Sequence, residues 1–296
     1  DTVKEPFFEE MMSRIASFID PKAITYIISN HAEMDHSGAL PRAIEAINPK
    51  KVLASNMGVS ALKAHFHFDF EITEVQQGIP LLLGDAKFLF LETKMLHWPD
   101  SMFTYFVNDK ILFSQDTFGQ HFATTQLFAD AHDHTLLKQE AAKYYANILM
   151  PFSPLVKRLL SNKFFNELAI NIIAPDHGPL WRHQKDIEWI LGLYQEWSQK
   201  PLYKKAVIVY DTMWKSTSQM AEAIADGVMS EGLLVTLCPL SSSHRSDIAT
   251  ELLEAGALLV GTPTLNQQMF PTVADMFCYI KGLKPTYLLG QAFGSY

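Results

Sequence analysis

The chain has 296 residues, of which 48% are hydrophobic and 12% aromatic, so it can bury a substantial core and is long enough for about two domains of ordinary size. Its formal net charge of −8 argues against a nucleic-acid binder, which would carry a basic patch to neutralise phosphates. No stretch approaches the roughly 18 uninterrupted apolar residues that span a bilayer, and the first twenty residues are too charged for a signal peptide. We therefore expect a soluble, cytoplasmic protein.

From residue 1 to about 200, short apolar runs that are typical of strands alternate with turns and helical patterns. These runs lie at residues 23–29, 51–54, 87–92, 111–114 and 170–174. A helical pattern over residues 186–199 follows them and leads to a linker around residues 199–201. We therefore place a first domain at residues 1–200.

A regular alternation of strand and helix patterns begins after this linker. It comprises a strand at 206–210, a helix at 218–231, a strand at 233–239, a helix at 247–255 and a strand at 257–261. This alternation predicts a parallel sheet with right-handed crossovers. We place the second domain at residues 203–296.

The cysteines and the two ends give further expectations. Cys238 and Cys278 form no Cys-x-x-Cys pair, which excludes a thiolate cluster and a disulfide framework, and we expect both to be buried free thiols. The chain opens at Asp1 without a methionine and stops at Tyr296 directly after a strand-like run. We therefore expect that an N-terminal part of the first domain and a C-terminal part of the second lie outside this sequence.

A dense group of potential metal ligands follows the first strand-like run, where residues 30–38 read NHAEMDHSG. His31, Glu33 and Asp35 alternate, so they can lie on one side of an extended or loosely turning loop, and His36 adds a nitrogen from another direction. Two neighbouring metals could share such a loop. The alternative is a polar loop that caps a helix beginning near Gly38, with the acids favoured by the helix dipole.

Three more candidate ligands favour the metal interpretation, because a helix cap explains none of them. His97, Asp116 and His177 each follow a strand-like run. Loops that follow parallel strands gather at one edge of a sheet. The sequence therefore predicts that these side chains meet the 30–38 loop.

At these residues the sequence resembles the flavodiiron proteins, and the resemblance covers nearly the whole chain. It implies an α/β fold: a metallo-β-lactamase-like αββα domain followed by a flavodoxin-like domain with a doubly wound parallel sheet. It also implies two irons bridged by Asp116. The ligands of one iron would be His31, Glu33, His97 and Asp116, and those of the other Asp35, His36, Asp116 and His177.

The residue types favour iron over zinc in this site. Hydrolytic relatives of the fold usually carry histidine where Glu33 stands, and a carboxylate there makes the site harder and richer in oxygen, which suits a redox-cycling iron pair. Zinc and manganese stay open, because protein ligands alone do not enforce selectivity.

The remaining histidines are weaker candidates. We expect His65 and His67 at the end of a surface helix and His132 and His134 in a polar turn, so neither pair is assigned to a metal. His121 is either a hydrogen-bonding partner that orients a ligand or an ordinary packed histidine, and it stays outside the predicted ligand set.

Two loops of the second domain indicate an anion-binding edge. Residues 211–218 read DTMWKSTS between a strand and a helix, where backbone N–H groups, the helix dipole and the hydroxyl groups favour a phosphate. An ordinary Ser/Thr helix cap is the alternative. A second loop at residues 261–266 follows the third strand and reaches the same carboxyl edge, where ligands bind.

Both loops and the terminal residues 292–296 resemble the FMN-binding loops of the flavodiiron proteins. The resemblance implies the phosphate at the first loop and the isoalloxazine ring between the other two. The implied FMN contacts are Thr212, Met213, Trp214, Lys215, Ser216, Thr217, Pro263, Thr264, Leu265, Asn266, Ala292, Phe293, Gly294, Ser295 and Tyr296.

The two cofactors together suggest a reductase of small gases. Two irons and a reduced FMN can deliver the four electrons that turn dioxygen into two waters, and two electrons suffice to couple two nitric oxides to nitrous oxide and water. The resemblance implies an external donor, such as a small rubredoxin, and a head-to-tail homodimer or a dimer of dimers. The preferred gas, the donor and the oligomer size stay open.

Two alternatives belong to other classes of function. One is a zinc-dependent hydrolase of the metallo-β-lactamase superfamily with an appended flavodoxin-like domain, against which Glu33 argues. The other is a flavodoxin-like electron carrier with a degenerate metal domain. The seven filled ligand positions argue against that carrier.

Overall fold

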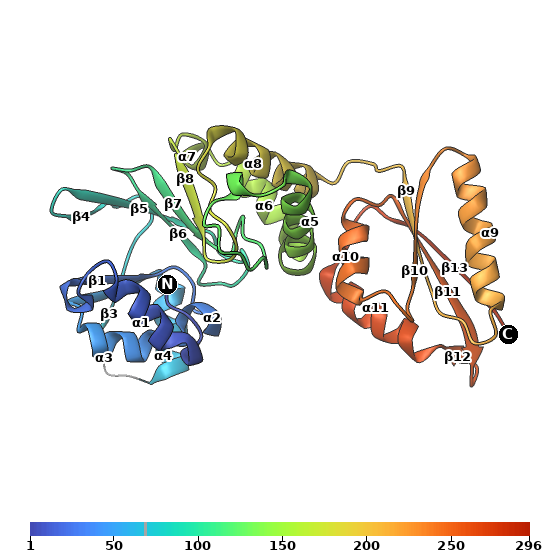
Figure 1. Cartoon of the computed structure of the whole chain (residues 1–296), viewed down its shortest axis with the longest axis horizontal. Helices are drawn as coiled ribbons and strands as arrows, with labels where there is room; N and C mark the ends of the chain where they lie inside the picture. The colour runs from blue at the N-terminus through green and yellow to red at the C-terminus, as the bar shows by residue number, and fades with distance from the viewer. Residues whose placement is uncertain (68–69) are drawn as a thin grey trace. The chain divides into compact units, whose positions relative to one another are not determined.

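The computed structural model describes residues 1–67 and 70–296 and divides into two compact units (Figure 1). The first unit comprises residues 1–133 and 158–191, and the second comprises residues 134–157 and 192–296. The packing thus assigns residues 134–157 and 192–200 to the second unit, although they precede the boundary expected from the sequence. The domain limits at 200 and 203 stay a prediction.

The first unit contains two sheets. The parallel sheet has the order β1 (Tyr26–Ser29), β2 (Lys51–Ala54) and β3 (Ile72–Glu74). The second sheet has the order β4 (Leu81–Leu83), β5 (Ala86–Glu92), β6 (Met102–Phe106), β7 (Ile111–Gln115) and β8 (Ile172–Pro175). Its pairs are antiparallel except for β7 and β8, which run parallel. The sequence predicted β1, β2, β5, β7 and β8 and missed the three others.

Several helices lie in this unit or enter it. They are α1 (Phe8–Ala16), α2 (Met34–Ser37), α3 (Leu40–Ile47), α4 (Asn56–Phe66), α6 (Ser153–Leu160), α7 (Lys163–Asn166) and α8 (Gln184–Gln199). Helix α3 shows why they form. Leu40, Ala43, Ile44 and Ile47 recur at helical spacing and are all buried, and Asn48 ends the helix in the left-handed conformation that asparagine tolerates.

Strand β2 is buried on both of its faces and thereby joins the layers of the unit. Val52 and Ala54 pack with residues of α3 and α4, whereas Leu53 points the other way and packs with Phe90 and Met102 of the second sheet. Alternation along a strand sends neighbouring side chains to opposite faces. The order of helices, sheet and second sheet agrees with the expected αββα fold.

The second unit is a doubly wound parallel sheet, as the sequence predicted. The strands have the order β10 (Leu234–Pro239), β9 (Lys205–Tyr210), β11 (Ala257–Leu265) and β13 (Leu289–Ser295), and β12 (Gln268–Met269) pairs antiparallel with the end of β11. One face carries α9 (Ser216–Ser230), and the other carries α10 (Arg245–Leu253) and α11 (Pro271–Leu283) (Figure 1).

Residues 134–157 pack on α10 and α11 as part of this unit. They form α5 (His134–Tyr144), a π-helical turn (Tyr145–Leu149), a 3₁₀ turn (Met150–Phe152) and the start of α6. Asn147 accepts a hydrogen bond from the Tyr279 hydroxyl at 2.6 Å, and Lys143 pairs with Asp247 at 2.7 Å. No sequence pattern predicts these contacts, because they join segments about a hundred residues apart.

Three expectations about the second unit are wrong. Strand β11 continues through Leu265, so Pro263, Thr264 and Leu265 lie in a strand and not in a loop. Residues 292–295 belong to β13 for the same reason, since Thr262 pairs with Gly294 and extends the parallel ladder. Cys238 is buried as expected, but Cys278 lies on the exposed side of α11.

Within residues 1–67 and 70–296, no helix is long and apolar enough to cross a bilayer.

Candidate functional site

The loop that follows β1 carries four of the predicted ligands, but only its first half is extended. Glu33 has an extended backbone, and residues Met34–Ser37 then form the single helical turn α2. The Ser37 hydroxyl closes this turn by donating to the carbonyl oxygens of Ala32 at 2.7 Å and of Glu33 at 3.0 Å. Of the extended and the loosely turning loop that the sequence left open, the structure shows the turning one. The turn separates Asp35 and His36 from Glu33.

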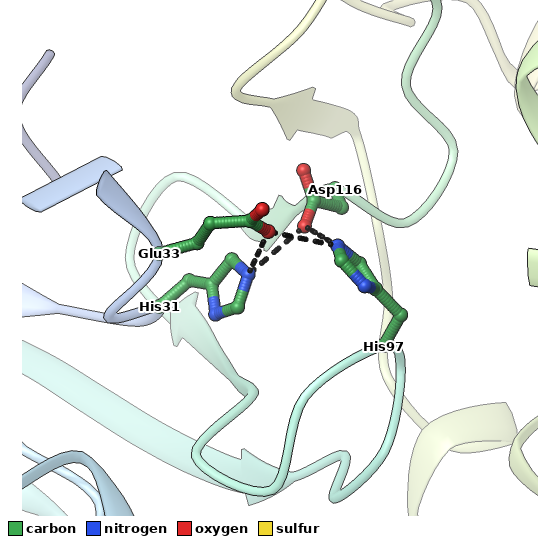
Figure 2. Close-up of side chains that lie close together, drawn as sticks. All are labelled: His31, Glu33, His97 and Asp116. Atoms are coloured by element: carbon green, nitrogen blue, oxygen red, sulfur yellow. Dashed lines mark ion pairs between the residues drawn. The ribbon is translucent and has the colours of Figure 1, made fainter. Parts of the chain in front are cut away.

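A first group of potential ligands consists of His31, Glu33, His97 and Asp116 (Figure 2). Asp116 Oδ2 lies 3.2 Å from His31 Nε2 and 3.0 Å from His97 Nε2. Glu33 Oε2 lies 3.4 Å and 3.2 Å from the same two nitrogens. Figure 2 shows the four side chains converging from three loops onto one point.

A second group consists of Asp35, His36 and His177 and faces the other oxygen of Asp116. Asp116 Oδ1 lies 3.1 Å from His36 Nε2 and 3.2 Å from His177 Nε2. The Asp35 carboxylate lies 3.6 Å from His36 Nε2 and 3.5 Å from His177 Nε2. Asp116 thus presents one oxygen to each group, which is the geometry of a bridging ligand.

Two atoms of these groups suit metal ions. His31 Nε2 and Asp35 Oδ1 are buried and have no hydrogen-bond partner among residues 1–67 and 70–296. An unsatisfied buried polar atom costs about 1–3 kcal/mol. Metal coordination would remove this cost, and nitrogen and carboxylate ligands in these numbers suit two divalent transition-metal ions. The residues present therefore fit a dinuclear centre.

In the second unit, the structure brings the predicted phosphate loop and the chain end together. Ser295 Oγ, at the end of β13, lies 3.4 Å from Ser216 Oγ and 3.3 Å from Thr217 Oγ1 at the start of α9. Gly261 of β11 leaves room for the Phe293 ring of β13, because a Cβ at this residue would meet that ring at 2.5 Å. The carboxyl ends of β9, β11 and β13 therefore form one edge, as a ligand at this edge requires.

The first turn of α9 has no Ser/Thr cap. The cap position is taken by Lys215, whose backbone is left-handed and whose side chain makes no capping hydrogen bond within the described chain. Thr212 Oγ1 is buried and also without a partner among the described residues. A phosphate would accept from this hydroxyl and from the N–H groups of the turn. Trp214 is 84% exposed and Tyr296 is fully exposed at the same edge.

Known protein families match both parts of the chain. The model of the ODP family beta lactamase matches residues 1–178, and that of flavodoxin matches residues 208–293. A nitric oxide reductase of Moorella thermoacetica is 45% identical over the whole chain, which covers 74% of that relative. The solved structure of rubredoxin oxygen:oxidoreductase from Desulfovibrio gigas has a TM-score of 0.97 and 40% identity, with 99% of this chain and 74% of that chain covered.

A second solved structure decides the family. The flavodiiron protein from Giardia intestinalis matches with a TM-score of 0.95 and 34% identity, over 99% of this chain and 72% of that chain. The chain belongs to the flavodiiron protein family. The sequence-based resemblance and the two-part fold are thereby confirmed.

In this flavodiiron protein, two carboxylates bond the Nδ1 atoms of two predicted ligand histidines. His31 Nδ1 donates to Asp100 Oδ2 at 3.0 Å, and the same oxygen accepts from the Ala32 N–H at 2.6 Å. His36 Nδ1 donates to Asp176 Oδ2 at 2.9 Å. Each bond selects the tautomer whose Nε2 lone pair faces the metal groups and makes that nitrogen a stronger ligand.

Sequence reasoning missed the roles of Asp100 and Asp176. Their positions gave a usable signal, because Asp100 stands three residues after His97 and Asp176 directly precedes His177. A carboxylate beside a predicted ligand on a short loop is a natural partner for a neighbouring histidine. The sequence could not tell which histidine each one reaches, since both bonds cross between loops.

The carboxylates dominate the electrostatics of the metal groups. Burial lowers the pKa of His31, but the carboxylates of Asp100, Asp116 and Glu33 outweigh it and raise that pKa to about 11. Burial and Asp116 oppose each other in the same way at His36 and His97, whose pKa values rise to about 9. The flavodiiron site without metal therefore holds protons at neutral pH, and a metal ion must displace them.

The pKa values of the acids move in the opposite direction. His31 and His97 lower the pKa of Glu33 to about 2. Burial alone would raise the pKa of Asp116, but the four histidines around it hold that pKa far below its usual range. Both acids are therefore ionised and ready to bind cations at neutral pH.

The remaining histidines of the first unit lie at its surface. His65 lies in the last turn of α4 and His67 caps this helix in the left-handed conformation, as expected. The His121 ring packs edge-to-face on His177, with the ring centroids 5.5 Å apart. His121 thus adjoins the second group of ligands, and its role stays open.

Proposed function

We propose that this flavodiiron protein is a cytoplasmic oxidoreductase that reduces dioxygen to water, nitric oxide to nitrous oxide, or both. One observation carries the proposal. The buried Asp116 carboxylate offers one oxygen to each of two groups of histidine and carboxylate side chains. The relatives named nitric oxide reductase and rubredoxin oxygen:oxidoreductase support both substrates.

The seven predicted ligands would hold two non-haem irons. His31, Glu33, His97 and Asp116 would hold one, and Asp35, His36, Asp116 and His177 the other. When bound, the irons supply electrons and Lewis-acidic positions for a diatomic substrate. The protein fixes the spacing of the two positions through Asp116 and the direction of the histidine lone pairs through Asp100 and Asp176.

The second unit would hold FMN at the edge formed by β9, β11 and β13. Thr212, Ser216 and Thr217 would bind its phosphate together with the N–H groups at the start of α9. The exposed Trp214 and the residues near Asn266 and Tyr296 would contact the ring. Bound FMN supplies stored electrons to the metal site.

Reduced FMN must be refilled by a donor, and a small rubredoxin-like protein suits this role. The name of the Desulfovibrio gigas relative supports such a donor. We further propose a head-to-tail homodimer, or a dimer of dimers, that brings the FMN of one subunit to the metal site of its partner. The rival hydrolase is not favoured, because the relatives named above are oxidoreductases.

Metal and flavin analysis of the purified protein tests the proposal. Two irons and one FMN per chain are expected, together with donor-dependent consumption of dioxygen or nitric oxide measured with gas-selective electrodes. Two zincs, no flavin and hydrolytic activity would instead restore the hydrolase. Size-exclusion chromatography with light scattering tests the dimer separately, and a monomer at micromolar concentration would exclude it.

A further inference from the structure

Gln115 is buried at the end of β7, where three loops of the metal site meet. Its side chain is fully enclosed, with 0% of the residue exposed. The amide Nε2 donates to the carbonyl oxygen of Leu96 at 2.5 Å, and the amide Oε1 accepts from the backbone N–H of Asp116 at 2.7 Å. The backbone carbonyl of Gln115 accepts from the N–H of Asp176 at 2.9 Å.

Each of these three bonds reaches a loop that carries a predicted ligand. Leu96 directly precedes His97, and Asp176 directly precedes His177. The third bond is made to Asp116 itself. The separation of 3.0 Å between His97 Nε2 and Asp116 Oδ2 therefore depends on two loops that the Gln115 amide holds together.

The backbone at Gln115 shows that this arrangement overrides local preference. Its φ of 45° lies in the left-handed region, which costs a residue other than glycine about 1 kcal/mol or more. The pairing of β7 with β8 also shifts register between Phe113 and Gln115. Irregularities of this kind re-aim side chains beside active sites. Here the chain turns out of the strand, and Asp116 reaches both metal groups.

The alternative is that Gln115 merely fills space in the core. A space-filling role needs no amide, and leucine would then serve equally well. Both polar ends of the side chain are instead bonded to backbone groups that would be left buried and unsatisfied by leucine, at about 1–3 kcal/mol for each group.

We propose that Gln115 is a positioning residue that sets the distance between His97 and Asp116. It thereby sets the affinity of the first group for its metal ion and the environment of that ion. The inference rests on the proposed binding of metal by these residues, but it does not depend on which gas is reduced. Because the amide joins the backbone beside His97 to the backbone of Asp116, and His97 belongs to the first group, the ion held with His31 and Glu33 is the one affected most.

The test compares Gln115→Leu and Gln115→Glu with the wild-type protein. Leucine removes both amide bonds at similar volume, and glutamate keeps the volume and an acceptor for Asp116 while it loses the donor to Leu96. Anaerobic ferrous titrations against a chelator should show binding of one of the two ions weakened by between about tenfold and 100-fold. Mössbauer spectra should show one altered iron environment, and kcat should fall while KM for the donor stays unchanged.

Gln120→Leu is the matched control. Gln120 is buried in the same loop, but its amide has no hydrogen-bond partner among the described residues, and its backbone bond to His177 survives the substitution. Metal affinity and spectra should therefore match the wild type. Circular dichroism and FMN content confirm that each variant is folded.

The outcomes separate the inference from the proposed function. Wild-type protein that binds no metal would refute the function. Wild-type affinity and spectra in both Gln115 variants would refute the positioning role, as would equal losses in Gln120→Leu. If zinc proves to be the resident metal, the same titration with zinc tests Gln115 without reference to any redox activity.

Discussion

Removing the charge of Asp100 should weaken the binding of one metal ion about tenfold without emptying the site. Asp100→Asn keeps the volume and one oxygen but loses the negative charge behind His31. Asp100 Oδ2 accepts two hydrogen bonds, and its side chain is only 3% exposed, so solvent screens it little. Hydrogen bonds to charged groups contribute about 1.5–3 kcal/mol and neutral ones about 0.5–1.5 kcal/mol. The bond to His31 should therefore lose about 1.4 kcal/mol, which is a factor of ten in affinity.

Asp176→Asn is the comparison that tests this reasoning. Asp176 accepts a hydrogen bond from His36 Nδ1, and its side chain is 26% exposed, so water can replace part of what the carboxylate contributes. We expect Asp176→Asn to lower the affinity for the ion held by His36 less than Asp100→Asn lowers the affinity for the ion held by His31. Anaerobic ferrous titration of both variants against a chelator measures the two affinities. A larger loss in Asp176→Asn than in Asp100→Asn, or no loss in either, would refute the argument from burial.

Three further predictions concern pH, backbone and flavin. In the metal-free protein, the pKa of His31 is raised from 6.5 to about 11 and that of Glu33 is lowered from 4.5 to about 2. The stability that His31 contributes is complete below pH 6.5 and is lost as pH rises toward 11. The stability that Glu33 contributes is present above pH 4.5 and is lost as pH falls toward 2. Calorimetric melting temperatures should therefore peak between pH 4.5 and 6.5 and should depend less on pH when metal is bound. Gly178→Ala should destabilise the fold by roughly 1–3 kcal/mol in urea unfolding, because φ is 77° and the new Cβ would lie 2.8 Å from a carbonyl oxygen; Gly192→Ala, with open space around it, should be neutral or stabilising. Thr212→Val should weaken FMN binding in fluorescence titrations but leave the melting temperature of the flavin-free protein unchanged or higher, because the hydroxyl is buried without a partner among the described residues. A valine variant that binds FMN normally would remove this hydroxyl from the phosphate site.

The sequence predicted the metal ligands better than their surroundings, and the reason is geometric. Four of the seven predicted ligands lie within six residues, and the others follow strands, so chain order already implies where they meet. Asp100, Asp176 and Gln115 act across loops that are close only in the folded chain. The sequence places Asp100 and Asp176 near predicted ligands but does not show which histidine each one reaches, and no local pattern marks the contacts of Gln115. That the seven predicted ligands bind metal stays a prediction, whereas their placement in two groups is a property of the structure.

The errors in the second unit have a similar origin. Residues 262–265 contain threonine and proline and therefore look like a loop, but the ladder with β13 and the short pairing with β12 keep them in a strand. Tertiary pairing overrides local strand propensity in such segments. The regular alternation from residue 205 onward was predicted correctly because it begins with β9, which is buried along nearly its whole length and carries a continuous apolar run.

The distribution of acids also explains how one site can hold iron in two oxidation states. Glu33, Asp35 and Asp116 would provide three ligand carboxylates, and Asp100 and Asp176 would add two that act through histidine. With neutral histidines, these five negative charges face four positive charges from two ferrous ions and six from two ferric ions. The net charge of the site is then −1 in one state and +1 in the other. Because uncompensated charge in a buried site is costly, a balance centred on zero keeps both oxidation states accessible. Removal of either supporting carboxylate should therefore disfavour the ferric state and raise the reduction potential of the pair.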